Sequence, residues 1–278
     1  MLVRKLMTLA VRLIPFRMRH LIRKIPGVAG FQRVLVDQTL SDSEFVHRVD
    51  AGPAAGIRFQ IKMPDDKGIW TGTYESDFAE ILADNVHDGD IAFDIGSWHG
   101  FFAGVMAAQG AREVHAFEPL PRNGERIAHL VRLNPGKKIV LHQVAVGDKE
   151  GEMELEILPE DSMARLSESR FKRTASAGRA ISVKLISIDQ FVADGESPPP
   201  DVIKIDVEGA EMLVLNGARK TIEMHRPRLF IEVHSSELLD DCERFFELVA
   251  YRVQSLDEDP RAAIARDVFQ IAAVPNET

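Results

Sequence analysis

Apolar and polar positions along this chain follow two alternating patterns, one typical of strands and one typical of helices. Short apolar runs bounded by glycine, proline or polar residues predict buried strands. These runs are Ile91–Ile95, Glu113–Phe117, Lys138–Val146, Asp201–Val207 and Arg228–His234. Neighbouring segments carry apolar residues three or four positions apart, which predicts helices. The predicted helices are Glu75–Val86, Phe101–Gln109, a helix that ends near Leu133, Glu211–Met224 and Glu237–Ala250.

This order of strands and helices predicts an α/β fold with a doubly wound, mostly parallel sheet. Further strands flank the repeat: Glu152–Leu158 should pair with Ile181–Ile188, and Arg252–Leu256 with Val268–Val274. Short strands with turns are expected over residues 45–70. The polar segment Pro159–Ala180 carries five basic residues, and it is either a lid that could hold phosphate or sulfate on a substrate or a solvated loop.

Composition places the chain among ordinary globular proteins. It has 278 residues, of which 45% are hydrophobic and 28% charged, and this balance excludes a disordered chain. The net charge of -9 argues against a nucleic-acid partner, which usually meets a basic surface. We expect one domain over residues 37–278, with its core at 70–250.

The charge is unevenly distributed. Residues 1–36 carry eight basic residues and no acidic one, so the remainder has a net charge of -17. Apolar residues recur at helical spacing over residues 1–25, which predicts a basic amphipathic helix. This helix either lies on an anionic membrane surface or packs on the domain. The single cysteine, Cys242, excludes an internal disulfide, so we expect a cytoplasmic protein. The alternative is a cytoplasmic protein that contacts the inner face of a membrane peripherally.

Candidate chemistry lies directly after the predicted strands, because ligands of such sheets bind beyond the carboxyl ends of the strands. Asp94 and Gly96 end the first strand, and Gly100 follows before the next helix. This spacing predicts a tight turn that brings the backbone close to a ligand. Glu118 follows the second strand and could accept hydrogen bonds from both hydroxyls of a ribose. Dinucleotide-binding enzymes also combine a glycine turn with an acidic residue that binds ribose, so the turn and Glu118 do not identify the cofactor.

Charged residues interrupt the apolar strand at Asp201–Val207. Lys204, Asp206 and Glu208 share one face at a period of two. Buried charges need partners, so an ion pair of Lys204 with Asp206 or Glu208 is expected, with either a functional or a purely structural role. His234 follows the next strand, where it could act as a general base or as a structural group.

Five segments of the chain resemble the FkbM family of S-adenosylmethionine-dependent methyltransferases. They are Trp70–Glu75, Ala92–Gly96, Ala116–Pro119 with Asn123, Ala145–Gly147 and Val202–Glu211. The resemblance covers residues from about 70 to 250 and implies a class I methyltransferase fold. That fold has a seven-stranded, Rossmann-like sheet whose last strand runs antiparallel.

The resemblance implies a role for individual residues. The positions that would contact S-adenosylmethionine are Glu75, Asp94, Gly96, Ser97, Gly100, Glu118, Pro119, Asn123, Ala145, Val146 and Asp206. Asp94, Gly96 and Gly100 would line the methionine part, and Glu118 would bind the ribose. The family usually has Ala-Asn after the glycine, whereas this chain has Ser97 and Trp98. The asparagine contact is therefore lost, and a large side chain replaces it.

The resemblance also implies methyl transfer to a hydroxyl, which needs a base to take the hydroxyl proton. We expect His234 or Asp206 in that role, with Glu208 beside them. No metal is assigned, although a divalent ion held by Asp206 and Glu232 is the alternative. The acceptor is expected to be a sugar, a glycan or a lipid-linked saccharide.

Three other functions stay open at this point. The acceptor could be a polyketide or another secondary metabolite. A nicotinamide-dependent oxidoreductase would need the Gly-x-Gly-x-x-Gly turn that this chain lacks. A non-catalytic, membrane-peripheral cofactor-binding protein would be favoured if Trp98 blocked the site. Neither the acceptor nor the oligomeric state follows from the sequence.

Overall fold

The computed structural model of the chain describes residues 43–157, 164–166, 179–257 and 259–276. No helix in these ranges is long and apolar enough to cross a membrane. The predicted basic helix at 1–25 and most of the polar segment 159–180 lie outside the described residues, so their roles stay predictions.

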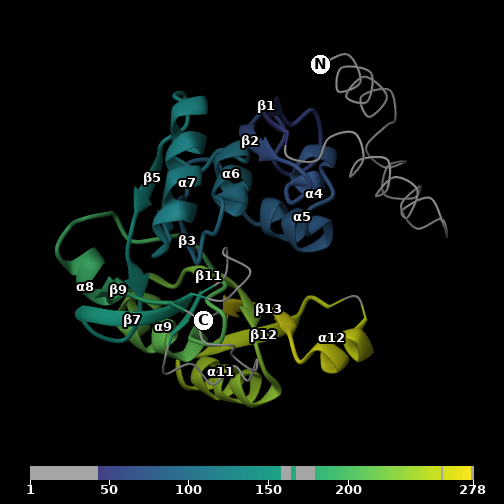
Figure 1. The fold of residues 1–278 in the computed structure, drawn as a ribbon. Coiled ribbons are helices and arrows are strands. Elements are labelled where there is room, and N and C mark those ends of the chain that lie inside the picture. The colour runs from purple at the N-terminus through teal and green to yellow at the C-terminus, as the bar shows by residue number, and fades with distance from the viewer. Residues whose placement is uncertain (1–42, 158–163, 167–178, 258, 277–278) are drawn as a thin grey trace.

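A seven-stranded sheet forms the centre of the molecule, in the order β12-β13-β11-β10-β3-β4-β5 (Figure 1). Its strands are β3 (Ile91–Ile95), β4 (Glu113–Phe117), β5 (Ile139–His142), β10 (Val202–Ile205), β11 (Arg228–Val233), β12 (Tyr251–Ser255) and β13 (Phe269–Pro275). All neighbours are parallel except the two pairs that involve β13. The predicted seven-stranded, doubly wound sheet with an antiparallel last strand is therefore confirmed.

Helices cover both faces of this sheet (Figure 1). One face carries α5 (Ser76–Asp84), α6 (Phe101–Ala108) and α7 (Pro121–Leu133), and the other carries α8 (Ile188–Ala193), α9 (Glu211–Gly217), α10 (Arg219–His225) and α11 (Ser236–Leu248). Because side chains alternate along a strand, Ala92 packs with the first set of helices and Phe93 with the second. Fully burying a side chain such as Phe93 contributes roughly 1.5–3 kcal/mol to stability.

A hairpin at the N-terminal side of the described chain packs against the first set of helices. It consists of β1 (Glu44–Arg48) and β2 (Arg58–Lys62), followed by α4 (Lys67–Thr71) where only a turn was expected. Phe59 of β2 lies 6.0 Å from Phe101, ring centroid to centroid. It also lies over Gly104, where a Cβ atom would come within 2.6 Å of the Phe59 ring. The absent side chain at Gly104 therefore lets the hairpin dock closely on α6.

Two predicted elements were wrong, because the structure divides each of them in two. The single strand expected at Lys138–Val146 is divided into β5 and β6 (Ala145–Val146), and β6 joins a second sheet in the order β6-β9-β7-β8. In that sheet β7 (Gly151–Ile157) and β9 (Arg179–Ile186) form the expected antiparallel pair, while β8 (Ala164–Leu166) was not predicted.

The helix expected at Glu211–Met224 is two helices, α9 and α10, which separate at Ala218. Gly217 explains the break, because a Cβ atom there would lie 1.8 Å from the carbonyl oxygen of Gly147. A short helix, α12 (Pro260–Arg266), was also not predicted, although Asp259 caps its first turn by accepting from the backbone N–H groups of Arg261 and Ala262.

Candidate active site

A cavity of about 290 Å³ opens at the carboxyl ends of β3, β4, β10 and β11. The second sheet contributes part of its wall through β6, and the residues before α5 contribute another part. The predicted site residues that line it are Glu75, Gly96, Ser97, Glu118, Pro119, Asn123, Ala145, Val146, Asp206 and Glu208. Most of the residues predicted for the site therefore line one cavity.

Three predicted residues do not line the cavity. Asp94 is fully buried behind the cavity. Its carboxylate accepts a 2.6 Å hydrogen bond from the Ser97 hydroxyl and pairs with Lys204. Gly100 begins α6 and packs on α7, where a Cβ atom would come within 2.8 Å of Leu130. His234 lies behind the acidic residues that it contacts. The expectation that Asp94 and Gly100 line the methionine part is thus corrected: both support the turn from behind.

Gly96 holds the turn after β3 against the chain after β10. Its φ of +75° lies in the left-handed region, and a Cβ atom would lie 1.7 Å from the carbonyl oxygen of Asp206. Only glycine combines this backbone angle with this close approach. The turn is also fixed from β4, because the N–H groups of Gly96 and Ser97 both donate to the carbonyl of Phe117.

Glu118, which directly follows β4, has its carboxylate held against this turn. It accepts hydrogen bonds from the backbone N–H groups of Trp98 and Leu120, both at 2.9 Å, and from the Asn123 amide at 3.2 Å. Burial raises the pKa of Glu118 to about 7, although these donors oppose the rise. The side chain is 4% exposed and lines the cavity, so its position is set before any ligand binds.

Trp98 lies against the cavity wall. Its φ is +47°, and its ring stacks on Tyr74 at a centroid distance of 5.7 Å and on His99 at 3.5 Å. A cavity remains beside this stack, so Trp98 does not block the site. Trp98 therefore gives no support to a non-catalytic function.

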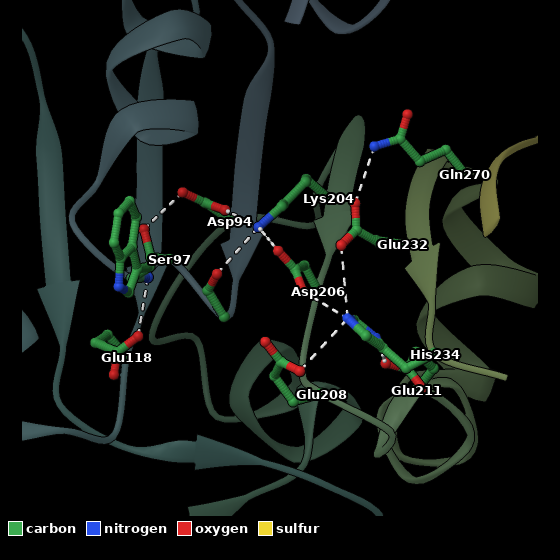
Figure 2. A network of polar contacts seen from close by, with 12 residues as sticks. Asp94, Ser97, Glu118, Lys204, Asp206, Glu208, Glu211, Glu232, His234 and Gln270 are labelled. Carbon is green, nitrogen blue, oxygen red and sulfur yellow. Dashed lines mark hydrogen bonds and ion pairs between the residues drawn. The ribbon is translucent and has the colours of Figure 1, made fainter. Parts of the chain in front are cut away.

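Lys204 connects the turn to the acidic side of the cavity (Figure 2). Its ammonium group donates to the carbonyl of Gly96 at 3.0 Å and pairs with Asp94 at 3.5 Å and with Asp206 at 3.4 Å. Burial alone would lower the pKa of Lys204, but the surrounding carboxylates, Asp206 first, raise it above its usual value. The predicted ion pair with Asp206 is confirmed, and Asp94 is a partner that the sequence did not reveal.

His234 is the centre of an acidic cluster, which we define as Asp206, Glu208, Glu211 and Glu232 (Figure 2). Its Nδ1 lies 2.8 Å from Oε1 of Glu211, and since a carboxylate only accepts, Nδ1 carries the proton. Its Nε2 lies 3.5–3.7 Å from the other three carboxylates.

The cluster shifts the titration of its members. Burial would lower the pKa of His234, but the hydrogen bond to Glu211 and the other carboxylates raise it to about 11. Burial raises the pKa of Glu208 to about 7, while the nearby His234 opposes that rise. A second contact outside the cavity fixes Glu232, which accepts from the Gln270 amide at 2.9 Å. Glu211 and Gln270 were missed, because each lies far in sequence from the residue that it orients.

Metal-binding potential is also concentrated here. Asp206, Glu232 and His234 each offer a ligand atom, and the three atoms lie within 4.8 Å of one another. The sequence suggested only the two carboxylates for this purpose.

The strand order, the antiparallel last strand and the glycine turn beside a buried acidic residue together define a Rossmann-like class I methyltransferase fold. Residues 86–253 match the methyltransferase FkbM domain family. The chain belongs to this family.

The chain is similar to several individual proteins. The hexuronic acid methyltransferase AglP of Haloferax volcanii is 28% identical over 161 residues, which cover 58% of this chain and 63% of AglP. The methyltransferase FkbM structure from Methylobacillus flagellatus is 21% identical with a TM-score of 0.49, over 67% of this chain and 44% of that one. The structure of SMU.1697c from Streptococcus mutans, in complex with SAH, is 14% identical with a TM-score of 0.45, over 77% and 98%. The chain thus spans less than two thirds of the first two proteins.

Proposed function

We propose that this enzyme transfers a methyl group from S-adenosylmethionine to a hydroxyl of a sugar, within a glycan or a lipid-linked saccharide. The observation that carries the cofactor is the geometry of Glu118, a buried carboxylate that lines the cavity and is held by the backbone of the turn that follows Gly96. The sugar acceptor is supported by the similarity to AglP, whose name specifies a hexuronic acid.

The cofactor would occupy the side of the cavity nearest β3 and β4. Glu118 would accept hydrogen bonds from the ribose hydroxyls, and Ala145 and Val146 would contact the adenine. The backbone of Gly96 and Ser97 would approach the methionine part. A sulfonium carries positive charge, so the carboxylates on the far side of the cavity would attract the methyl-bearing end of the cofactor.

Methyl transfer mainly requires alignment of the acceptor oxygen with the methyl carbon and sulfur. The oxygen–carbon bond forms as the carbon–sulfur bond breaks, and the cofactor leaves as a neutral thioether. Of the three residues predicted for catalysis, Asp206 and Glu208 line the cavity, while His234 lies behind them. We assign the hydroxyl proton to Glu208, whose carboxylate borders the cavity and has a pKa of about 7.

Calorimetry tests the cofactor, and labelled methyl transfer tests the acceptor. S-adenosylmethionine should bind to the full chain and NAD should not, and Glu118→Ala should weaken binding at least tenfold. Glu223→Ala, an exposed position on α10, is the matched control that should bind normally. Methyl transfer should occur to glycans that contain a uronic acid. Transfer to polyketides but to no sugar would overturn the acceptor class, and binding of NAD alone would overturn the cofactor.

A further inference from the structure

We propose that Asp206, Glu232 and His234 bind one divalent transition-metal ion at the acidic end of the cavity, and that this ion holds the oxygen of the acceptor. The proposal rests on the proposed function only for the identity of the acceptor. Binding of the ion itself follows from the residues described below.

The distances within the cluster suit ligands of one ion. Nε2 of His234 lies 3.5 Å from Oε1 of Glu232 and 3.7 Å from Oδ1 of Asp206. Ligand atoms about 2.1 Å from a shared ion stand roughly 3–4 Å apart, and both distances from Nε2 fall in this range. Asp206 follows β10, and Glu232 and His234 end β11, so two adjacent strands of the core hold the three ligands rigidly.

Outer contacts orient the ligand atoms toward a common point. Glu211, which is fully buried, accepts the Nδ1 proton of His234, and Nε2, which has to release its proton to bind an ion, faces Asp206 and Glu232. Gln270 donates to Oε2 of Glu232 and leaves Oε1 facing the same point. A histidine that binds a metal through one ring nitrogen usually donates from the other to a carboxylate or carbonyl. Figure 2 shows His234 between Glu211 on one side and the other carboxylates of the cluster on the other.

The charge of the cavity also favours a cation. Five carboxylates line it: Glu75, Glu118, Asp206, Glu208 and Glu232. Among the described residues of the lining, Lys204 is the only basic one, and it is already paired with Asp94 and Asp206. A uronic acid would be repelled from such a surface. A divalent ion at the acidic end would neutralise two charges and attract the acceptor.

The donor set indicates the kind of ion. One imidazole nitrogen with two carboxylate oxygens suits Mn²⁺ or Zn²⁺ better than Mg²⁺ or Ca²⁺, which prefer all-oxygen sites. Three protein ligands leave open positions, and Asp206 and Glu232 both reach the cavity, so an acceptor hydroxyl can bind there. Coordination lowers the pKa of the hydroxyl, and its proton passes to Glu208. The oxygen then forms its bond to the methyl carbon while the carbon–sulfur bond breaks.

The test measures Mn²⁺ on the full chain after dialysis against EDTA. Calorimetry should find about one Mn²⁺ per chain, and electron spin echo spectroscopy of the wild type should detect coupling to an imidazole nitrogen. His234→Ala and Glu232→Gln should weaken binding at least tenfold. Glu211→Gln should weaken it about 10–100-fold, as outer-shell changes do. The control Glu223→Gln should bind like the wild type.

Three results would overturn the proposal: no stoichiometric binding of Mn²⁺ or Zn²⁺, bound Mn²⁺ without nitrogen coupling, or unchanged affinity in the variants. The spectroscopic measurement uses the wild type, so it decides the matter even if a variant fails to fold. S-adenosylmethionine binding separates this proposal from the proposed function. Glu118→Ala should lose the cofactor and retain Mn²⁺, whereas Glu232→Gln should lose Mn²⁺ and retain the cofactor.

Discussion

The carboxylates on the two sides of the cavity have different surroundings. On the side of β3 and β4, Glu118 receives three hydrogen bonds from protein groups. On the side of β10 and β11, Asp206, Glu208 and Glu232 lie around a single histidine, with carboxylate oxygens 3.5–3.7 Å from its Nε2. The first side is organised before a ligand arrives, while the second carries negative charge that a cationic partner would balance. Lys204 couples the two, since it contacts both Gly96 and Asp206.

The largest expected effect is on stability, and it comes from adding a side chain at Gly96, where the turn after β3 contacts the chain after β10. Gly96→Ala should lower the free energy of unfolding by at least about 3 kcal/mol, because the new Cβ atom would clash with the backbone of Asp206. Gly195→Ala is the matched control: Gly195 has the same φ of +75° with nothing within 4 Å, so only the backbone penalty of roughly 1–2 kcal/mol applies. Denaturant unfolding measures both, and equal losses would show that the close approach is unimportant.

The burial of Glu118 predicts a pH dependence of stability. Its pKa rises from 4.5 to about 7 on folding, so between these values the folded protein holds a proton that the unfolded chain releases. Raising the pH through this window therefore favours the unfolded state. Relative to Glu118→Gln, the wild type should lose up to about 3 kcal/mol between pH 4.5 and 7.5, at roughly 1.4 kcal/mol per pKa unit. Parallel stability curves for the two proteins would contradict an ionisable group with this burial.

Cofactor affinity separates the two sides more directly. Glu118→Ala should raise the Kd for S-adenosylmethionine about 10–100-fold, since a hydrogen bond to a charged group contributes about 1.5–3 kcal/mol. Glu232→Gln, on the other side, should change it by less than about threefold. Calorimetry at one pH measures both. A similar loss in the two variants would mean that the cofactor contacts both sides equally.

The smallest expected effect concerns Trp98, whose φ of +47° is unfavourable for most residues. Trp98→Asn and Trp98→Ala both remove the stack on Tyr74 and His99. Asparagine tolerates the left-handed region, so Trp98→Asn should be more stable than Trp98→Ala by about 1 kcal/mol. Thermal unfolding of the two variants measures this difference, and the reverse order would show that the turn is not strained.

The main elements of the fold could be predicted because each has a local cause. Ile91–Ile95 matches the expected strand residue for residue, since apolar side chains must be buried on both faces of a central parallel strand. The failures have nonlocal causes. The predicted helix at Glu211–Met224 is broken where Gly217 meets Gly147, a contact between residues 70 positions apart in the chain. The strand at Lys138–Val146 is divided because β6 pairs with β9 in a different sheet.

The candidate site follows the same division. Glu118 could be chosen because it directly follows an apolar strand, and Asp206 because a charged residue within an apolar strand needs a partner or a function. The partners of His234 could not be chosen in this way. Glu211 lies on α9, and Gln270, which orients Glu232, lies on β13, so neither shares a strand end with the residues that they support.

The sequence by itself determined the class of fold, the family and the positions where the cavity would form, because periodicity and strand-end motifs are local properties of the chain. Only the tertiary structure decided what those positions do together. In the structure Asp94 and Gly100 lie behind the cavity wall, and Lys204 contacts the Gly96 turn. It also brought one potential ligand atom from each of Asp206, Glu232 and His234 within 4.8 Å of one another. Distances between side chains depend on how separate strands and helices pack, and no local pattern specifies that packing.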